Sequence, residues 1–324
     1  MTAPSDLADR LGLAPGARAI ILNADDFGMC HAANTAIVDL LTTTRIDSTT
    51  VMVPCSWSPE ALAFAASRPD LDVGVHLVLT SEWTRYRWRP LTGTRSGGTS
   101  SGGTGGGGTG TSLVDAAGFF PTDVLSVEQN ASDEDVAAEL SAQLQAALDA
   151  GVDVTHLDNH MGSVYGLVTG RDFLRPVFEL AAQHGLPFRL PRSMDGVGEN
   201  PALQAQLDRA AAAADASGVE IIDRLWSHPF ELLREGAPDE ETYEEVRDGF
   251  IALLRAVPAG VTEIYLHPMV DDDELRAAVD FSATKRGYEL RLLSDPVVLQ
   301  AIEDEALVRI GWRDLRDLQR RSAR

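Results

Sequence analysis

Short apolar runs alternate with longer stretches of helical periodicity along most of the chain. The short runs are rich in β-branched and aliphatic residues, which is typical of buried parallel strands. The strand candidates are Ala19–Asn23, Ser48–Val53, Val73–Leu79, Val154–Asp158, Pro187–Leu190, Val219–Asp223, Thr262–His267 and Tyr288–Leu292. Helical patterns lie between them, near 31–44, 59–68, 133–150, 171–184, 200–217, 239–256 and 273–286. This alternation predicts parallel βα units and an α/β barrel, a fold that averages about 250 residues and accepts loop insertions.

One segment interrupts this pattern between the third and fourth strand candidates. Residues 93–112 are almost entirely Gly, Ser and Thr, a composition that buries too little apolar surface to order itself. The strand pattern resumes beyond it. We therefore expect a single domain over residues 1–324 with a flexible insert, rather than two domains joined by a linker.

The charge of the chain argues against two classes of partner. The formal net charge is −22, whereas nucleic acids and anionic membranes require a basic face. The N-terminal residues lack the apolar core of a signal peptide, and no run approaches the roughly 20 apolar residues of a membrane span. The two cysteines, Cys30 and Cys55, make no disulfide framework. We expect a reduced, cytoplasmic protein, and its oligomeric state, a homodimer included, stays open.

Acids and histidines gather where the strand candidates end. The first strand runs into Asp25 and Asp26, while His76 and His156 lie within two others and His267 ends a late one. In parallel α/β folds the functional groups collect at the carboxyl ends of the strands. These side chains are therefore expected at one rim of the barrel.

The paired aspartates and two of the histidines indicate a metal site. Adjacent carboxylates at a strand end repel each other unless a cation or a shared proton relieves them. The alternative is that Asp25 and Asp26 cap the following helix and face solvent. His76 or His156 alone would more often be a hydrogen-bonded core histidine. Together with one carboxylate they form a ligand set suited to Zn²⁺ or a similar ion with open positions for water.

The remaining histidines near these strand ends have more than one possible role. Asp158 and His160 alternate with His156 along one strand, so the three side chains face the same way and a ligand could be oriented by its neighbours. His267 is preferred over His228 as a functional acid because its strand is more clearly apolar. A capping or packing role is the alternative for His228.

The loop at residues 81–90 interleaves aromatic and arginine side chains, Trp83 and Trp88 among them. Aromatic faces of this kind suit the apolar faces of a sugar. The alternative is that the loop anchors the flexible insert to the barrel.

At these residues the sequence resembles the YdjC/ChbG family of carbohydrate deacetylases. The matching stretches are ILNADDFG (21–28), Asn34, GVHLVLT (74–80), THLDNHMG (155–162), FRLPR (188–192), LHP (266–268) and KRGYEL (285–290). They occur in family order over most of the chain. The resemblance implies a distorted TIM-like barrel that removes acetyl groups from N-acetylated amino sugars, with a small carbohydrate as its partner.

The resemblance also implies roles for individual residues. The metal ligands would be Asp26, His76 and His156, holding one divalent ion such as Mg²⁺ or Zn²⁺. Asp25 would be the catalytic base and His267 the general acid. Arg189 would support the active-site carboxylate and belong to the substrate-binding residues. Two departures from the family pattern are Met161-Gly162-Ser163, where further histidines are usual, and the glycine-rich insert. Both lie where substrate recognition would be decided.

Other functions remain open on the residues alone. A metal-independent glycosidase would use Asp25 and Asp158 as its two carboxylates. A non-catalytic sugar-binding barrel would bind through the loop that carries Trp83 and Trp88. A Rossmann dehydrogenase is disfavoured because no glycine fingerprint follows the first strand.

Overall fold

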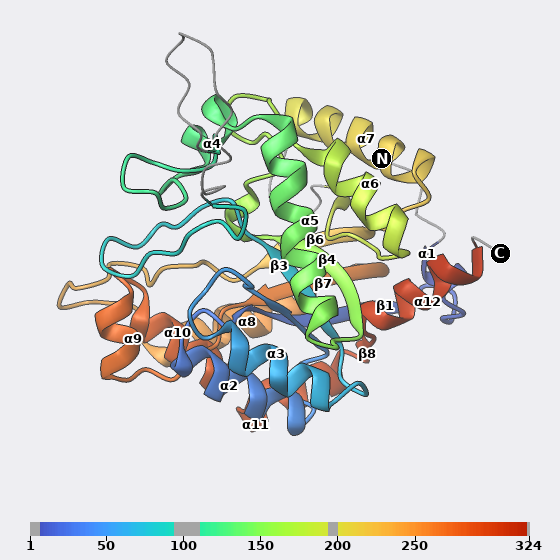
Figure 1. Ribbon diagram of the computed structural model, residues 1–324. Helices are drawn as coiled ribbons and strands as arrows, with labels where there is room; N and C mark the ends of the chain where they lie inside the picture. The colour runs from blue at the N-terminus through green and yellow to red at the C-terminus, as the bar shows by residue number, and fades with distance from the viewer. Residues whose placement is uncertain (1–6, 94–110, 194–199, 323–324) are drawn as a thin grey trace, which may run out of the picture.

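The computed structural model describes residues 7–93, 111–193 and 200–322. Its centre is a parallel sheet with the strand order β4–β3–β2–β1–β7–β6–β5, and β8 pairs with β1 beside this path (Figure 1). The strands are β1 (Arg18–Phe27), β2 (Ser48–Val51), β3 (Val73–Leu77), β4 (Val154–Asn159), β5 (Pro191–Ser193), β6 (Ile222–Ser227), β7 (Gly260–Leu266) and β8 (Val308–Arg309).

The two edges of this sheet approach each other. A parallel bridge joins Leu157 of β4 to Phe188, just before β5. The backbone N–H of Arg189 donates to the carbonyl of Leu157 at 2.9 Å, which extends the contact. The sheet therefore curls into the distorted TIM-like α/β barrel that the sequence predicts.

Helices surround the curled sheet in the part of the chain that the structure describes (Figure 1). Those that connect the strands or follow them are α1 (Leu7–Arg10), α2 (His31–Thr42), α3 (Ser58–Ser67), α4 (Val124–Asn130), α5 (Asp133–Asp149), α6 (Leu174–His184), α7 (Pro201–Ala216), α8 (Tyr243–Ala256), α9 (Asp273–Ala278), α10 (Ala283–Leu292), α11 (Pro296–Asp304) and α12 (Trp312–Ser322), with the 3-10 turn η1 (His160–Gly162) after β4. Trp312 packs with Ala19 and Ile21 of β1 in a small core cluster, so α12 covers the amino-terminal end of the barrel.

The expected strand at Tyr288–Leu292 is wrong, because these residues belong to helix α10. The buried side chains of this helix are Ala283, Lys285, Arg286, Glu289 and Leu292, which recur at helical spacing rather than every second residue. The helix expected at 273–286 is divided into α9 and α10. Helices α1, α4, α11 and α12 and the short strand β8 were not anticipated.

The insert expected at residues 93–112 lies almost entirely outside the described residues. At its far end, the backbone N–H of Ser112 donates to Asp135 of α5 at 2.7 Å. None of the helices in the described ranges combines the length and the apolar character needed to cross a membrane.

Candidate active site

A β-bulge at the end of β1 turns both adjacent aspartates toward the same pocket. Consecutive side chains of a regular strand face opposite sides. Here Ala24 pairs with Thr49 and Phe27 with Val51, so β1 carries one residue more than its neighbour across this step. Asp26 has a φ of 67°, in the left-handed region that few non-glycine residues occupy. Bulges and strained residues of this kind concentrate at functional sites.

Glycine and asparagine hold the turn that follows the bulge. Gly28 has a φ of 88°, and a Cβ at this position would approach the Cα of Ser58 to 3.0 Å. The side-chain oxygen of Asn34 accepts the Gly28 N–H at 2.8 Å. The close contact and the positive φ together require glycine here.

Asp26, His76 and His160 form a cluster that could hold a metal ion, with one ligand atom from each residue within 4.8 Å of the others. The Oδ1 atom of Asp26 lies 3.7 Å from Nε2 of His76 and 3.6 Å from Nδ1 of His160. This oxygen is buried and has no hydrogen-bond partner among the described residues. A buried carboxylate oxygen without a partner is costly, and a cation between it and two imidazole nitrogens would satisfy it.

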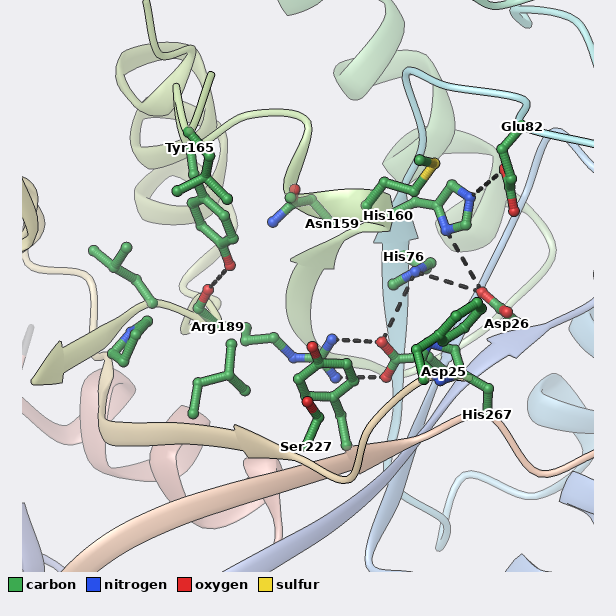
Figure 2. A pocket seen from close by; sticks show the side chains of 18 of the residues that line it. Asp25, Asp26, His76, Glu82, Asn159, His160, Tyr165, Arg189, Ser227 and His267 are labelled. Atoms are coloured by element: carbon green, nitrogen blue, oxygen red, sulfur yellow. Dashed lines mark hydrogen bonds and ion pairs between the residues drawn. The ribbon is translucent and has the colours of Figure 1, made fainter. Parts of the chain in front are cut away.

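Each imidazole is oriented by a carboxylate on its other nitrogen. Nδ1 of His76 lies 2.7 Å from Oδ1 of Asp158. Nε2 of His160 lies 2.9 Å from Oε2 of Glu82 (Figure 2). When these nitrogens donate to the carboxylates, the remaining nitrogen of each ring presents its lone pair toward Asp26. Carboxylate–histidine pairs of this type position the ligands of many metal sites.

The electrostatic surroundings favour positive charge at this cluster. Burial lowers the pKa of His76, but the carboxylates of Asp158, Asp25 and Asp26 outweigh this effect and raise the pKa to about 9. A surrounding that stabilises a proton on His76 also stabilises a divalent cation in its place. Burial raises the pKa of Asp26, but its neighbours His267 and Arg286 hold it below its usual value.

The contact between Glu82 and His160 leads to a prediction about metal affinity. Glu82→Gln keeps the size of the side chain and removes its charge, so His160 becomes a weaker and less well oriented ligand. We expect an increase in the dissociation constant of the metal of about 10- to 100-fold. Competition with a chelator of known affinity measures this change. Glu134→Gln, at an exposed position in the first turn of α5, is a suitable control. Equal affinities in the two variants would contradict the role given to Glu82.

Asp25 belongs to a second, hydrogen-bonded network. Arg189 donates to both oxygens of Asp25 at 2.7 Å, to Glu263 at 2.9 Å through Nε, and its Nη2 lies 2.9 Å from Oδ2 of Asp158. Asn23 adds a bond of 2.8 Å to Asp25. Burial raises the pKa of Asp25, but the guanidinium of Arg189 outweighs it and lowers the pKa below the usual range. Asp25 is therefore held ionised and in a fixed orientation.

This network places three carboxylates around one guanidinium. Burial raises the pKa of Glu263 to about 7, with repulsion from Asp25 and Asp158 added to it and the attraction of Arg189 opposing it. Three buried like charges cannot all be neutralised by a single cation, so one carboxyl group retains its proton more easily than the others.

The raised pKa of Glu263 predicts a dependence of stability on pH. The folded protein keeps a proton near pH 7 that the unfolded chain releases near its usual pKa of 4.5. The stabilising contribution is therefore complete below about pH 4.5 and is lost as the pH rises through about 7. As the pH rises across this range, the melting temperature of Glu263→Gln should fall less steeply than that of the unchanged protein. Parallel melting profiles would contradict the assignment.

His267 lies beside the two aspartates and lines the same pocket (Figure 2). Its backbone N–H donates to Glu289 of α10 at 2.6 Å, and its ring contacts Phe230 at a centroid distance of 5.0 Å. Burial lowers the pKa of His267 to about 4, although Asp26 opposes this effect. The imidazole is therefore neutral at rest.

His156, expected among the metal ligands, is not part of the cluster around Asp26. Its ring stacks on Trp312 at a centroid distance of 4.8 Å and lies against Gly74, whose added Cβ would approach the ring to 2.6 Å. It shares a face of β4 with Asp158, but successive residues on one face are separated by about 6–7 Å along the strand. His156 therefore lies one level deeper in the barrel. The position that it was expected to fill at the rim is taken by His160.

The expected substrate-binding tryptophans occupy different positions. Trp83 is buried and lines the pocket, where Arg286 lies over its ring at 5.6 Å. Trp88 packs behind His160 at a centroid distance of 5.9 Å, donates from Nε1 to the carbonyl of Thr80, and does not line the pocket. Arg189 lines the pocket, but its donors are directed at carboxylates, so it positions Asp25.

His228, whose role stayed open, lines the pocket and lies 2.6 Å from Nζ of Lys285 through its Nδ1. Burial and the neighbouring lysine lower the pKa of His228 to about 4. It lies outside the cluster of Asp26, His76 and His160.

The sequence reasoning missed several partners of the expected residues. Arg286 donates to Oδ2 of Asp26 at 3.0 Å, and this leaves Oδ1 for the two imidazoles. Its signal was present in the KRGYEL stretch, but that stretch was interpreted partly as a strand. Glu263 could have been noticed as a carboxylate within an otherwise apolar strand. Glu82 carried no signal beyond its place in the aromatic loop.

The site opens into a pocket of about 660 Å³ at the carboxyl ends of the strands. Its polar wall contains Asp25, Asp26, His76, His160 and His267. The volume lies in the range of roughly 300–1,000 Å³ that is typical of sites for small molecules.

Comparison with known proteins identifies relatives over nearly the whole chain. Residues 19–304 match the family described as YdjC-like protein. A carbohydrate deacetylase of Thermus thermophilus is 33% identical over 312 residues, which cover 96% of this chain and 98% of the relative. A chitooligosaccharide deacetylase of Yersinia enterocolitica is 29% identical over 229 residues, which cover 65% of this chain and 81% of the relative.

A solved structure from Enterococcus faecalis, described as a candidate cellobiose-phosphate cleavage protein, has a similar fold. Its TM-score is 0.66 at 22% sequence identity, and the match covers 92% of this chain and 99% of that chain. At this identity the likeness extends to the fold alone.

Proposed function

This chain belongs to the YdjC-like protein family, and from this membership and the geometry of the site we propose that it is a metal-dependent deacetylase of N-acetylated amino sugars. The observation that carries the proposal is the buried, unpartnered Oδ1 of Asp26, which faces one nitrogen of His76 and one of His160. An ionised Asp25 lies beside this cluster in the same pocket.

The proposed metal ligands are Asp26, His76 and His160. A divalent ion held there would polarise the carbonyl of the acetamido group and lower the pKa of a water beside it. Two imidazoles and one carboxylate suit Zn²⁺ and similar ions, and they leave positions free for substrate and water. Of the sequence-derived set, His156 is thus replaced by His160.

The proposed chemistry divides proton transfer between two residues. Asp25, fixed by Arg189 and Asn23, accepts a proton from the attacking water, whose oxygen forms the new bond to the acetyl carbon. The carbon–nitrogen bond of the amide then breaks, and His267 delivers a proton to the leaving amine nitrogen. Because His267 is neutral at rest, the proton that it delivers is the one that Asp25 took from the water and passed on within the pocket. This transfer returns Asp25 to its ionised form. The products are acetate and a free amino sugar.

The alternative of a metal-independent glycosidase fits the geometry less well. It needs Asp25 and Asp158 to flank a glycosidic bond. Asp158 is fully buried, binds His76, Thr50 and Arg189, and is not among the residues that line the pocket. A carboxylate enclosed in this way cannot reach a sugar.

The test is acetate release from a panel of N-acetylated sugars by protein that has been stripped of metal and then reconstituted. We expect acetate only after a divalent ion is returned, with one equivalent of metal per chain. Undiminished turnover after exhaustive chelation would refute the metal dependence. Binding of the sugars without acetate release from any metal-loaded sample would instead support a non-catalytic sugar-binding barrel.

A further inference from the structure

The pocket continues past Arg189 into a part whose walls are aliphatic. We call it the leucine compartment and define it by Leu167, Leu174, Leu190, Leu203, Leu207 and Leu225. These side chains come from the loop after η1, from α6 and α7, from the segment before β5, and from β6. Separate elements thus direct the same kind of side chain into one space.

The leucine compartment adjoins the catalytic carboxylate. Arg189 binds Asp25 through two nitrogens, and Leu190 is the next residue along the chain. Figure 2 places Tyr165 across the pocket from Asp26 and His160. A group that occupies the leucine compartment can therefore be part of a molecule whose acetamido group is at the metal cluster.

Two polar side chains near the leucine compartment, Gln206 and Tyr165, already donate hydrogen bonds to the backbone. Nε2 of Gln206 donates to the carbonyl oxygens of Tyr165 at 2.8 Å and of Gly166 at 3.3 Å. The hydroxyl of Tyr165 donates to the carbonyl of Arg189. A second sugar ring among these leucines would bury hydroxyl groups against aliphatic side chains, which is unfavourable, whereas a hydrocarbon chain would match them.

We propose that the leucine compartment binds an aliphatic chain, so that the preferred substrate is an N-acetylated amino sugar linked to an alkyl or acyl group. This inference rests on the proposed deacetylase function. The metal cluster would act on the acetamido group while the chain lies against the leucines of α6 and α7. A pocket of about 660 Å³ is of the size that holds such a bipartite small molecule.

Octyl and methyl glycosides of N-acetylglucosamine, with N,N′-diacetylchitobiose as the third ligand, test the proposal on metal-loaded protein. The octyl compound is kept below its critical micelle concentration. We expect kcat/KM for the octyl glycoside to exceed that of the methyl glycoside by about tenfold or more, since each buried methylene favours binding. Titration calorimetry of the same ligands measures binding without reference to turnover.

Two variants and one control locate the effect. Leu167→Gln and Leu203→Gln place an amide in the leucine compartment, and the side chain of Leu167 is 54% exposed, so its replacement leaves the core intact. Both variants should lose most of the preference for the octyl glycoside and keep the rate on the methyl glycoside. Leu125→Gln, 41% exposed on α4 and outside the pocket, should keep both.

The outcomes separate this inference from the proposed function. Equal rates and equal binding for the octyl and methyl glycosides would overturn the inference and leave the deacetylase intact. A preference for diacetylchitobiose over the octyl glycoside that Leu203→Gln weakens would also overturn it, because a sugar then occupies the leucine compartment. Octyl-selective binding without acetate release from any sugar would support the inference about the compartment and refute the proposed function.

Discussion

His160→Gln is expected to abolish metal binding and to lower deacetylase activity by more than about a hundredfold, because even the partners of metal ligands change affinity by about 10- to 100-fold. His156→Gln should keep one equivalent of metal and most of the activity. The two histidines are four residues apart and both are buried, so they form a matched pair. The pair distinguishes the proposed ligand set, with His160, from the set that the sequence suggested, with His156.

Metal analysis and thermal melting of the two proteins provide the measurements. His156 packs against Trp312 and Gly74, so His156→Gln should lower the melting temperature while its metal content remains. His160→Gln should lose its metal, and the melting temperature of the metal-free protein should change little. Metal loss in His156→Gln together with retention in His160→Gln would reverse the assignment.

Asp25→Asn should retain the metal and lose about 10²- to 10⁴-fold in kcat, the range typical of a lost general base. Asparagine keeps the shape of the side chain and can still accept a hydrogen bond from Arg189. It cannot accept the proton of the attacking water. The change should therefore affect kcat far more than the affinity for substrate.

The folded state should tolerate this replacement. Arg189 also contacts Asp158 and Glu263, so the loss of one carboxylate does not leave a buried cation unpaired. The pKa of Glu263 should fall in Asp25→Asn, because one of the charges that repel its ionised form is gone. Full activity in a folded, metal-loaded Asp25→Asn protein would exclude Asp25 as the base.

The barrel could be predicted from the sequence because strand and helix periodicities are local properties. Nearly every expected strand is present within a few residues, as β1 and β4 illustrate. The exception at Tyr288–Leu292 has a clear reason. In this stretch the apolar residues Tyr288, Leu290 and Leu292 alternate with charged ones, as they would in a strand. The buried face of the helix includes the charged side chains Arg286 and Glu289, which a count of apolar residues leaves out.

The site could be predicted only to the level of which strands contribute to it. The sequence suggested one strand for both His156 and His160, and alternation along a strand gives both the same direction. In the structure His156 lies in β4, and His160 begins the turn η1 directly after it. What separates them is depth along the barrel, which depends on where the rim lies and on the packing of Trp312 beneath His156. These are contacts between distant parts of the chain. The carboxylates that orient the imidazoles, Glu82 among them, are also long-range partners.

The central position of β1 has a consequence for synthesis of the protein on the ribosome. This strand, which ends in the two aspartates, pairs with β2 on one side and with β7 and β8 on the other. Most of the chain must be translated before β7 emerges. Until then an apolar strand edge stays unpaired, which is a site for chaperone binding or misassociation. All three proposed metal ligands are translated before the sheet that must align them is complete.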